Sequence, residues 1–262
     1  MREIKMTGRD SIKSVEKCFR LLNFIYISNQ SLTLEEFVKL SGYKKTSCFR
    51  LLKTMVKVEI LEQDHKNKTY QFGLNLVSIG LSAIKNMSLL KISSPILQKL
   101  RNETGETVNL SILNGTEILF IERLMSNHIV NLNRNVGDRL SVHCASMGKV
   151  ILAFMDESIT ENILNKLNFE AMTKNTFTNL GSFKNELKKI KQKGYAYNNE
   201  ELEMGLRAVA APIFNHTGEV IAAINLAWTT ARHPSKKSFQ KFTPKILEAA
   251  KRISFLMGYC ES

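Results

Sequence analysis

Residues 33–57 read TLEEFVKLSGYKKTSCFRLLKTMVK, a stretch that predicts two short helices joined by a tight turn. Thr33 and Glu36 have the spacing of a capping box, so the first helix begins at Thr33, and Gly42 ends it. The second helix is predicted over residues 45–58, and its two faces differ. The apolar face holds Cys48, Leu51, Leu52 and Met55, and the opposite face holds Lys45, Thr46, Ser47, Arg50, Lys53, Thr54 and Lys57. Two short helices, the second with a basic outer face, are typical of a helix-turn-helix.

The segments on both sides extend this pattern. Apolar residues recur at helical spacing from Ser14 to about Ser28 and predict a preceding helix. Residues 60–63 and 69–72 alternate like strands and flank a polar turn over 64–68, which predicts a β-hairpin with a basic tip. Three helices followed by such a hairpin predict a winged helix-turn-helix.

Individual roles follow from how a helix enters the major groove of DNA. We expect Thr46, Ser47 and Arg50 to contact base edges, and Lys45 to contact a guanine or a phosphate. The outer-face Thr54 belongs to the same DNA-facing surface. The residues expected at phosphates are Lys44, Lys53, Lys66 and Lys68. The alternatives are a solvated surface charge for each lysine and, for Arg50, a salt bridge to an acid of the preceding helix such as Glu36.

Composition supports an anionic partner. The chain has 262 residues, enough for two domains, and its 44% hydrophobic and 23% charged residues exclude a disordered or fibrous protein. Its 37 Lys and Arg exceed its 24 Asp and Glu by 13, which favours nucleic acid or an acidic membrane surface. Residues 1–75 carry fourteen Lys and Arg against eight Asp and Glu, so nearly half of the excess lies in less than a third of the chain.

Other classes of protein are disfavoured. No apolar run approaches the length of a membrane span, and the first residues lack the apolar core of a signal peptide, so we expect a cytoplasmic protein without a membrane partner. The four cysteines are far apart and form no metal-binding motif, which predicts reduced and mostly buried thiols. No metal or cofactor is indicated.

The remainder of the chain alternates helices and strands. A helix with a narrow apolar stripe follows residue 73 and ends near Asn86; the stripe either pairs with its copy in another subunit or packs within the chain. Further helices are predicted over 96–105, 182–193 and 244–257, and strands over 107–113, 118–121, 129–132 and 218–226. This order predicts an α+β or mixed α/β domain with an antiparallel core sheet.

Two stretches in this region are more specific: HCASMGKVILA over 143–153 and GYAYNNEELEMGLRAVAAPI over 194–213. With the helix that begins at Lys45, they make the chain resemble the IclR family of bacterial transcriptional regulators over about residues 11–258. The resemblance implies an α+β protein made of a winged helix-turn-helix DNA-binding domain over 1–73, a linker or dimerisation helix over 74–90 and a GAF-like mixed α/β effector-binding domain over 91–262.

The resemblance also implies a small-molecule site. Carried over position by position, its residues here are Ile129, Leu132, Ser146, Met147, Asn198, Ala208, Asn225 and Ala227. The chain departs from the family pattern, because Asn198 replaces a common acidic residue, Ala208 a Cys or Ser, and Asn225-Leu226-Ala227 a Ser-x-Ser pair. We therefore expect an effector whose carbonyl or hydroxyl groups pair with Asn198 and Asn225. The alternative is that both asparagines only bond the backbone of turns and strand edges.

Enzyme motifs are incomplete. Ser146 and Lys149 match the Ser-x-x-Lys pattern of acylating serine enzymes, but the accompanying motifs are missing, and Cys144 stands where a nucleophile elbow needs glycine. Arg207 could clamp a carboxylate, although an ion pair with Glu200 or Glu201 is the favoured interpretation.

The expected function is a regulator that is not an enzyme: a repressor of a catabolic operon, which binds a palindromic DNA operator as a homodimer or tetramer and responds to a small metabolite. The alternative is a small-molecule sensor that acts through a protein partner.

Overall fold

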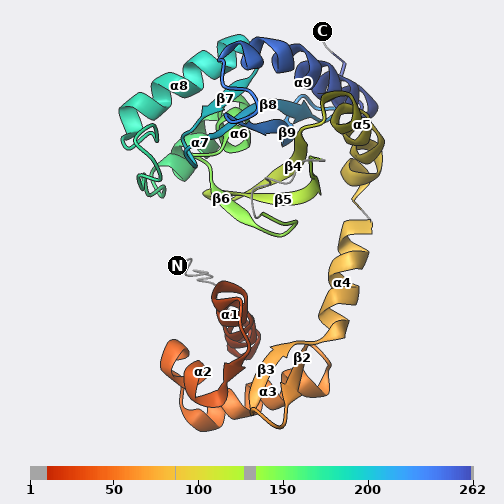
Figure 1. The fold of residues 1–262 in the computed structure, drawn as a ribbon. Coiled ribbons are helices and arrows are strands. Elements are labelled where there is room, and N and C mark those ends of the chain that lie inside the picture. The colour runs from red at the N-terminus through yellow and green to blue at the C-terminus, as the bar shows by residue number, and fades with distance from the viewer. Residues whose placement is uncertain (1–10, 86, 127–133, 261–262) are drawn as a thin grey trace. The chain divides into compact units, whose positions relative to one another are not determined.

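The computed structural model describes residues 11–85, 87–126 and 134–260, and the chain divides into two compact units, Met1–Asn86 and Met87–Ser262 (Figure 1). Each unit has its own hydrophobic core. Among the described residues, no helix is both long and apolar enough to span a membrane.

The first unit is a winged helix-turn-helix followed by one more helix. Its elements are α1 (Lys13–Ser28), β1 (Leu32–Thr33), α2 (Leu34–Ser41), α3 (Lys45–Lys57), β2 (Leu61–Asp64), β3 (Thr69–Phe72) and α4 (Leu74–Lys85). The predicted capping box is present, since the Thr33 side chain accepts from the Glu36 backbone and Glu36 accepts from the Thr33 backbone. Gly42 ends α2 with φ +70°, in the left-handed region that favours glycine.

The core of this unit lies between α1, α2 and α3 and its small antiparallel sheet, whose strand order is β1-β3-β2. Leu21 of α1, Phe37 of α2 and Leu52 of α3 are completely buried, with Tyr70 of β3 packed edge-on against Phe37. The apolar spacing seen in the sequence therefore turns one face of α3 inward and leaves its basic face outward.

The second unit is an antiparallel sheet covered by helices on both faces. Its elements are α5 (Ser88–Thr104), β4 (Thr107–Asn114), β5 (Glu117–Leu124), β6 (Arg139–Ser141), α6 (Ser146–Phe154), α7 (Glu157–Leu164), α8 (Leu180–Lys193), β7 (Ala196–Asn199), β8 (Leu206–Phe214), β9 (Val220–Thr229) and α9 (Lys237–Leu256). The strand order is β6-β5-β4-β9-β8-β7, and every neighbouring pair is antiparallel.

The two faces of this sheet hold separate cores. One core includes Trp228 of β9 and Phe242 of α9, with α5 beside α9. The other includes Ala223 of β9, Val150 of α6 and Phe183 of α8. The helices α6 and α8 cover this face of the sheet (Figure 1). The predicted antiparallel core sheet is confirmed.

Several predicted boundaries were wrong. The helices predicted from Ile96 and Pro244 begin earlier, at Ser88 and Lys237, so Pro95 and Pro244 lie inside α5 and α9. A proline removes one hydrogen bond from a helix interior, and tertiary packing holds both helices together across that loss. The last predicted strand is shifted to Val220–Thr229 because Gly218, with φ +81°, still belongs to the preceding turn. The strand predicted over 129–132 lies outside the described residues.

Candidate DNA-binding and effector sites

The helix α3 presents its polar face to solvent. Lys44, the residue before its first turn, is extended, and its side chain does not cap the helix. The predicted DNA-facing residues are exposed at Lys44, Lys45, Thr46, Arg50, Lys53, Thr54, Lys66 and Lys68, and half-buried at Ser47. The structure thus brings the α3 residues onto one outward surface, and the hairpin tip carries Lys66 and Lys68.

The charges on this surface differ in their partners. Lys45 Nζ lies 2.8 Å from Glu35 Oε1 of α2, and this contact lowers the pKa of the exposed Glu35 carboxyl. Glu36 is occupied by the capping box, and in the part of the chain that the structure describes Arg50 makes no ion pair. The alternative in which Arg50 pairs with Glu36 is therefore not observed, and it is Lys45 that pairs with the preceding helix.

The tip of the hairpin is organised by Asp64. Its Oδ1 accepts hydrogen bonds from the backbone of Lys66 at 2.8 Å and of Asn67 at 3.3 Å, and its Oδ2 accepts from Asn67 Nδ2 at 2.6 Å. These bonds lower the pKa of Asp64. Lys68 follows with φ +55°. The turn is therefore preorganised, and the two lysines project from a defined scaffold.

Several exposed or positively charged residues of this unit were not predicted from the sequence. Phe49 is 47% exposed, one position before Arg50, where an apolar ring is suited to contact a thymine methyl group. Lys17 Nζ and Arg20 Cζ of α1 lie 5.1 and 5.7 Å from the ring centroid of Tyr43 in the turn between α2 and α3. These cation–π contacts place two more positive charges beside the turn, and no sequence spacing predicts them because they join separate elements.

In the second unit, the residues that the family resemblance assigned to an effector site gather on one face of the sheet and on the helix that covers it. Strand register places Asn198 of β7 opposite Ala208 of β8, which lies opposite Ala227 of β9. Asn225 lies two residues before Ala227 on the same face. Ser146 and Met147 form the start of α6, and Ile129 and Leu132 lie outside the described residues.

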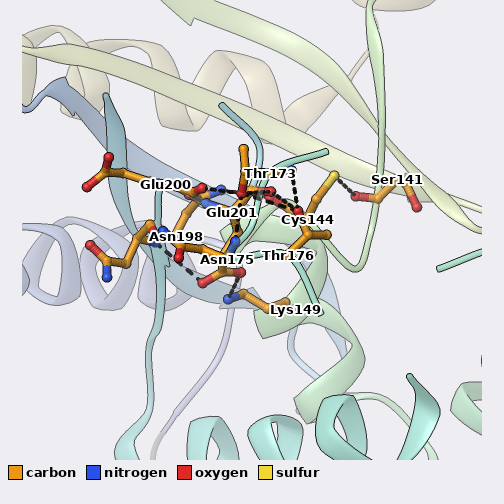
Figure 2. Close-up of polar contacts among 10 residues, drawn as sticks. Ser141, Cys144, Lys149, Thr173, Asn175, Thr176, Asn198, Glu200 and Glu201 are labelled. Atoms are coloured by element: carbon orange, nitrogen blue, oxygen red, sulfur yellow. Dashed lines mark hydrogen bonds and ion pairs between the residues drawn. The ribbon is translucent and has the colours of Figure 1, made fainter. Parts of the chain in front are cut away.

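The helix α6 is buried from Ser146 to Ala153, including its lysine. Lys149 is inaccessible to solvent, and its Nζ lies 2.5 Å from Glu201 Oε2 (Figure 2). Burial is the largest influence on Glu201 and raises the pKa of its carboxyl, although the Lys149 charge opposes that effect. This ion pair ties α6 to the turn between β7 and β8.

The same network occupies Asn198 (Figure 2). Its Nδ2 donates to the backbone oxygen of Cys144 at 2.7 Å, and its Oδ1 accepts from the backbone of Glu201 at 3.1 Å. Thr176 Oγ1 donates to the Glu201 carbonyl at 2.6 Å and holds the turn from its other side. Asn198 therefore bonds the backbone, as the alternative interpretation expected.

Two more polar residues of this face were missed in the sequence. Asn109 of β4 is 2% exposed and lies between Asn225 of β9 and Arg123 of β5 in strand register. Ser111 Oγ, two residues along, donates to Met147 Sδ at 3.2 Å and places the first turn of α6 over β4. Polar residues at every second position of an otherwise apolar strand (Thr107, Asn109, Ser111) were the available signal.

The residues of the incomplete enzyme motifs are not arranged for catalysis: some are held by structural hydrogen bonds, and Ser146 has no base among the described residues to activate it. Burial raises the pKa of the Cys144 thiol to about 11, and neighbouring His143 is held by Ser141 Oγ at 2.7 Å and the Glu170 carbonyl at 2.9 Å. Lys149 is bound to Glu201, and the hydroxyl of Ser146 has no hydrogen-bond partner among the described residues. The Ser-x-x-Lys spacing therefore does not produce an activated serine.

Two further predictions concern the ion pair of Arg207 and the burial of the four cysteines. Arg207 Nη2 lies 3.1 Å from Glu200 Oε1, so the predicted structural ion pair is confirmed. All four cysteines are free, but two are buried, Cys18 is half-buried and Cys260 is exposed, so "mostly buried" overstated their burial.

Comparison with known proteins assigns both units to one family. The model described as "IclR helix-turn-helix domain" matches residues 14–65, and "Bacterial transcriptional regulator IclR C-terminal" matches residues 81–255. The chain belongs to the IclR family of bacterial transcriptional regulators. Proteins of this family are helix-turn-helix regulators and not enzymes, so this IclR-family chain is a DNA-binding transcriptional regulator.

Similar proteins cover almost the whole chain. The regulator KdgR of Escherichia coli is 28% identical over 95% of this chain and 94% of its own length, and KipR of Bacillus subtilis is 30% identical over 94% and 98%. The crystal structure of an IclR regulator from Alicyclobacillus acidocaldarius has a TM-score of 0.82 at 25% identity, with 95% of this chain and all of that chain covered. An IclR homologue from Microbacterium hydrocarbonoxydans, solved with 4-hydroxybenzoate, has the same fold, with a TM-score of 0.81 at 22% identity over 93% and 98%.

Proposed function

We propose that this regulator represses a catabolic operon, binds a palindromic operator as a homodimer or tetramer, and is released by a small metabolite. In this proposal residues 1–73 bind DNA, residues 74–90 link and pair the subunits, and residues 91–262 bind the effector. The relatives named "Transcriptional repressor IclR" in Escherichia coli and "Acetate operon repressor" in Salmonella typhimurium support repression.

The exposed basic face of α3 is the observation that carries the DNA-binding part. Arg50 has no acidic partner in the described ranges of the chain and is exposed midway along the helix, where an arginine can contact a guanine with two hydrogen bonds. Lys44 and Lys53 extend the positive charge to both ends of α3 and suit phosphates on either side of the groove. Lys45 is half-neutralised by Glu35, so we assign it to phosphate rather than to a base.

Self-association is supported by α4. Ile79, which belongs to the apolar stripe seen in the sequence, is 54% exposed. Leu74, Val77 and Leu81 also recur at helical spacing and are 75%, 52% and 59% exposed, so the apolar surface of the helix is broader than that stripe. Exposed apolar area of this kind favours pairing with another subunit over packing within the chain. A dimer also explains how one short helix acquires enough DNA contacts, because two half-sites are bound together.

Effector binding is supported by the buried polar residues beside α6. The Ser146 hydroxyl is unpartnered among the described residues, in a side chain that is 2% exposed. The helix α6 also begins without a side-chain cap, so its first turn offers hydrogen-bond donors in a buried place. A bound small molecule with acceptor atoms would satisfy them. The carboxylate ligand of the Microbacterium homologue is of this chemistry.

Gel mobility shift with the promoter of the protein's own operon tests the proposal. Binding that Arg50→Ala weakens on the operator but not on an unrelated duplex supports it. Operator binding that stays fully selective in Arg50→Ala overturns the assignment of α3 as the recognition helix. If no duplex is shifted even at low salt, the sensor that acts through a protein partner becomes the better proposal.

A further inference from the structure

Three polar side chains form a row across the middle of the second unit's sheet. Asn225 of β9 lies directly opposite Asn109 of β4, and Asn109 lies directly opposite Arg123 of β5. All three face α6, because Ser111, two residues beyond Asn109, contacts Met147 of that helix. Asn109 and Asn225 are 2% and 8% exposed, so water does not complete their hydrogen bonding freely.

The orientation of the two amides is determined by the chemistry of Arg123. A guanidinium only donates hydrogen bonds, and Arg123 Nη1 donates to Asn109 Oδ1 at 2.9 Å. Asn109 must therefore turn its Nδ2 the other way, where it donates to Asn225 Oδ1 at 2.7 Å. Asn225 Oδ1 accepts this bond, and within the described residues Asn225 Nδ2 donates to no group.

The electrostatics of the row agree with this polarity. Burial is the main influence on Arg123 and lowers the pKa of its guanidinium, while the Asp138 charge opposes and the Arg134 charge adds to that effect. Arginine stays charged despite such shifts, so the direction of the hydrogen bonds does not reverse in the physiological pH range.

We infer that Arg123 polarises this relay of amides so that Asn225 presents a hydrogen-bond donor, and that the effector places a carbonyl or carboxylate oxygen against Asn225. The inference deepens the proposed effector binding and rests on it. The sequence alone allowed an effector with a carbonyl or a hydroxyl group and did not say whether Asn225 donates or accepts the hydrogen bond. The structure favours donation by Asn225. A donor placed against Asn225 Nδ2 would leave two donors facing each other, a mismatch that lowers affinity by roughly 5- to 150-fold.

The orientation itself is measured without a ligand by NMR of the side-chain amides, with the Asn225 signal assigned from its loss in Asn225→Ser. In the wild type and in Arg123→Lys, which keeps a donor, the Asn225 amide protons should exchange with solvent about tenfold faster than those of Asn109. In Arg123→Glu, which only accepts, both amides should turn round, so that Asn225 donates to Asn109 and its exchange slows by about tenfold. Equal protection of Asn225 in the Lys and Glu variants overturns the inference.

A second variant, Asn109→Asp, tests the same orientation in a protein that keeps Arg123, in case Arg123→Glu disturbs the fold. Asn109→Asp accepts from Arg123 and can only accept from Asn225, so it should also slow exchange of the Asn225 amide while Arg123 stays in place.

Acetate and methylammonium then serve as probes. Acetate alone should shift the wild-type Asn225 signal, and a shift by methylammonium, or by neither probe, overturns the acceptor requirement. The gel shift is independent of both NMR measurements. If the wild type does not bind an operator, the proposed function is wrong, but the orientation of the two amides measured by NMR is unaffected.

Discussion

The helices α3 and α6 have similar N-termini but lie in opposite environments, one exposed to solvent and the other buried. Each follows an extended residue, Lys44 or Ala145, whose side chain does not cap it, and α3 carries several positively charged side chains whereas α6 carries one. In α3 the charges lie in solvent, whereas in α6 the single lysine is inaccessible and bound to Glu201. The uncapped start of α3 therefore lies in solvent among several cations, where a phosphate would be stabilised, whereas the uncapped start of α6 lies in a buried place whose one cation is already paired.

The comparison teaches that burial, and not residue type, decides what a lysine does here. The exposed pair of Lys45 and Glu35 is free to exchange its partner for a phosphate, because water screens both charges. The buried pair of Lys149 and Glu201 has no such freedom, because separating it leaves a charge in an apolar core.

The largest expected effect comes from breaking the buried pair. Lys149→Met should lower the free energy of unfolding of the second unit by about 3–5 kcal/mol, because Glu201 remains buried without a counter-charge. Urea denaturation followed by circular dichroism measures this. Lys45→Met is the matched control and should leave the unfolding curve unchanged. Adding Glu201→Met to Lys149→Met should restore most of the loss, and equal losses in the two single variants would contradict the distinction.

Removing the exposed arginine of α3 should affect DNA and not stability. Arg50→Ala should weaken operator binding by about 1–3 kcal/mol, or roughly 5- to 150-fold, and relax the preference at one base pair of each half-site. Fluorescence anisotropy with the operator and with single-base variants measures both quantities. An Arg50→Ala protein with unchanged base preference would show that α3 contacts only phosphates.

The glycines of two helices test how tightly each is packed. A Cβ on Gly148 of α6 would lie 2.5 Å from Cα of Val142, so Gly148→Ala should destabilise the second unit by about 1–3 kcal/mol. On α4, no atom would lie within 4 Å of a Cβ at Gly80, so Gly80→Ala should stabilise the helix by about 0.5–1 kcal/mol. Thermal unfolding of both variants measures these changes in stability. Changes of the same sign would contradict the claim that α6 is tightly packed at Gly148 and α4 is open at Gly80.

The smallest effect is expected at the hairpin tip. Lys66→Ala should weaken binding to all DNA sequences alike and reduce the slope of log affinity against log salt by about 1, because one phosphate contact is lost. Titrations of the operator and of an unrelated duplex at several salt concentrations measure this slope. A loss confined to the operator would mean that Lys66 contacts a base.

Local signals explain which parts of the structure the sequence predicts well. The first unit follows from Thr33, Glu36 and Gly42, because capping and helix termination act within a few residues of the chain. The outward face of α3 follows equally from helical spacing. The partner of Lys45 does not, because Glu35 lies on a different helix and only packing brings them together.

The second unit is harder to predict because burial erases periodicity. The helix α6 is buried all round and has no polar face to reveal its period, and β8 is buried from Leu206 to Ile213. Most described residues of the proposed effector site follow from family resemblance, but Asn109 and Arg123 do not, since their hydrogen bonds join strands far apart in the sequence.

The sheet of the second unit also bears on solubility. Its outermost strands are its shortest: β6 covers three residues and β7 four. Pro212 of β8, which has no N–H to donate, lies just beyond the last residue pair with β7, and Asn175 Nδ2 donates to the Asn199 carbonyl of β7 at 3.2 Å. Such short, partly occupied margins offer little template for another chain to add a strand. Edge-to-edge aggregation through this sheet is therefore disfavoured.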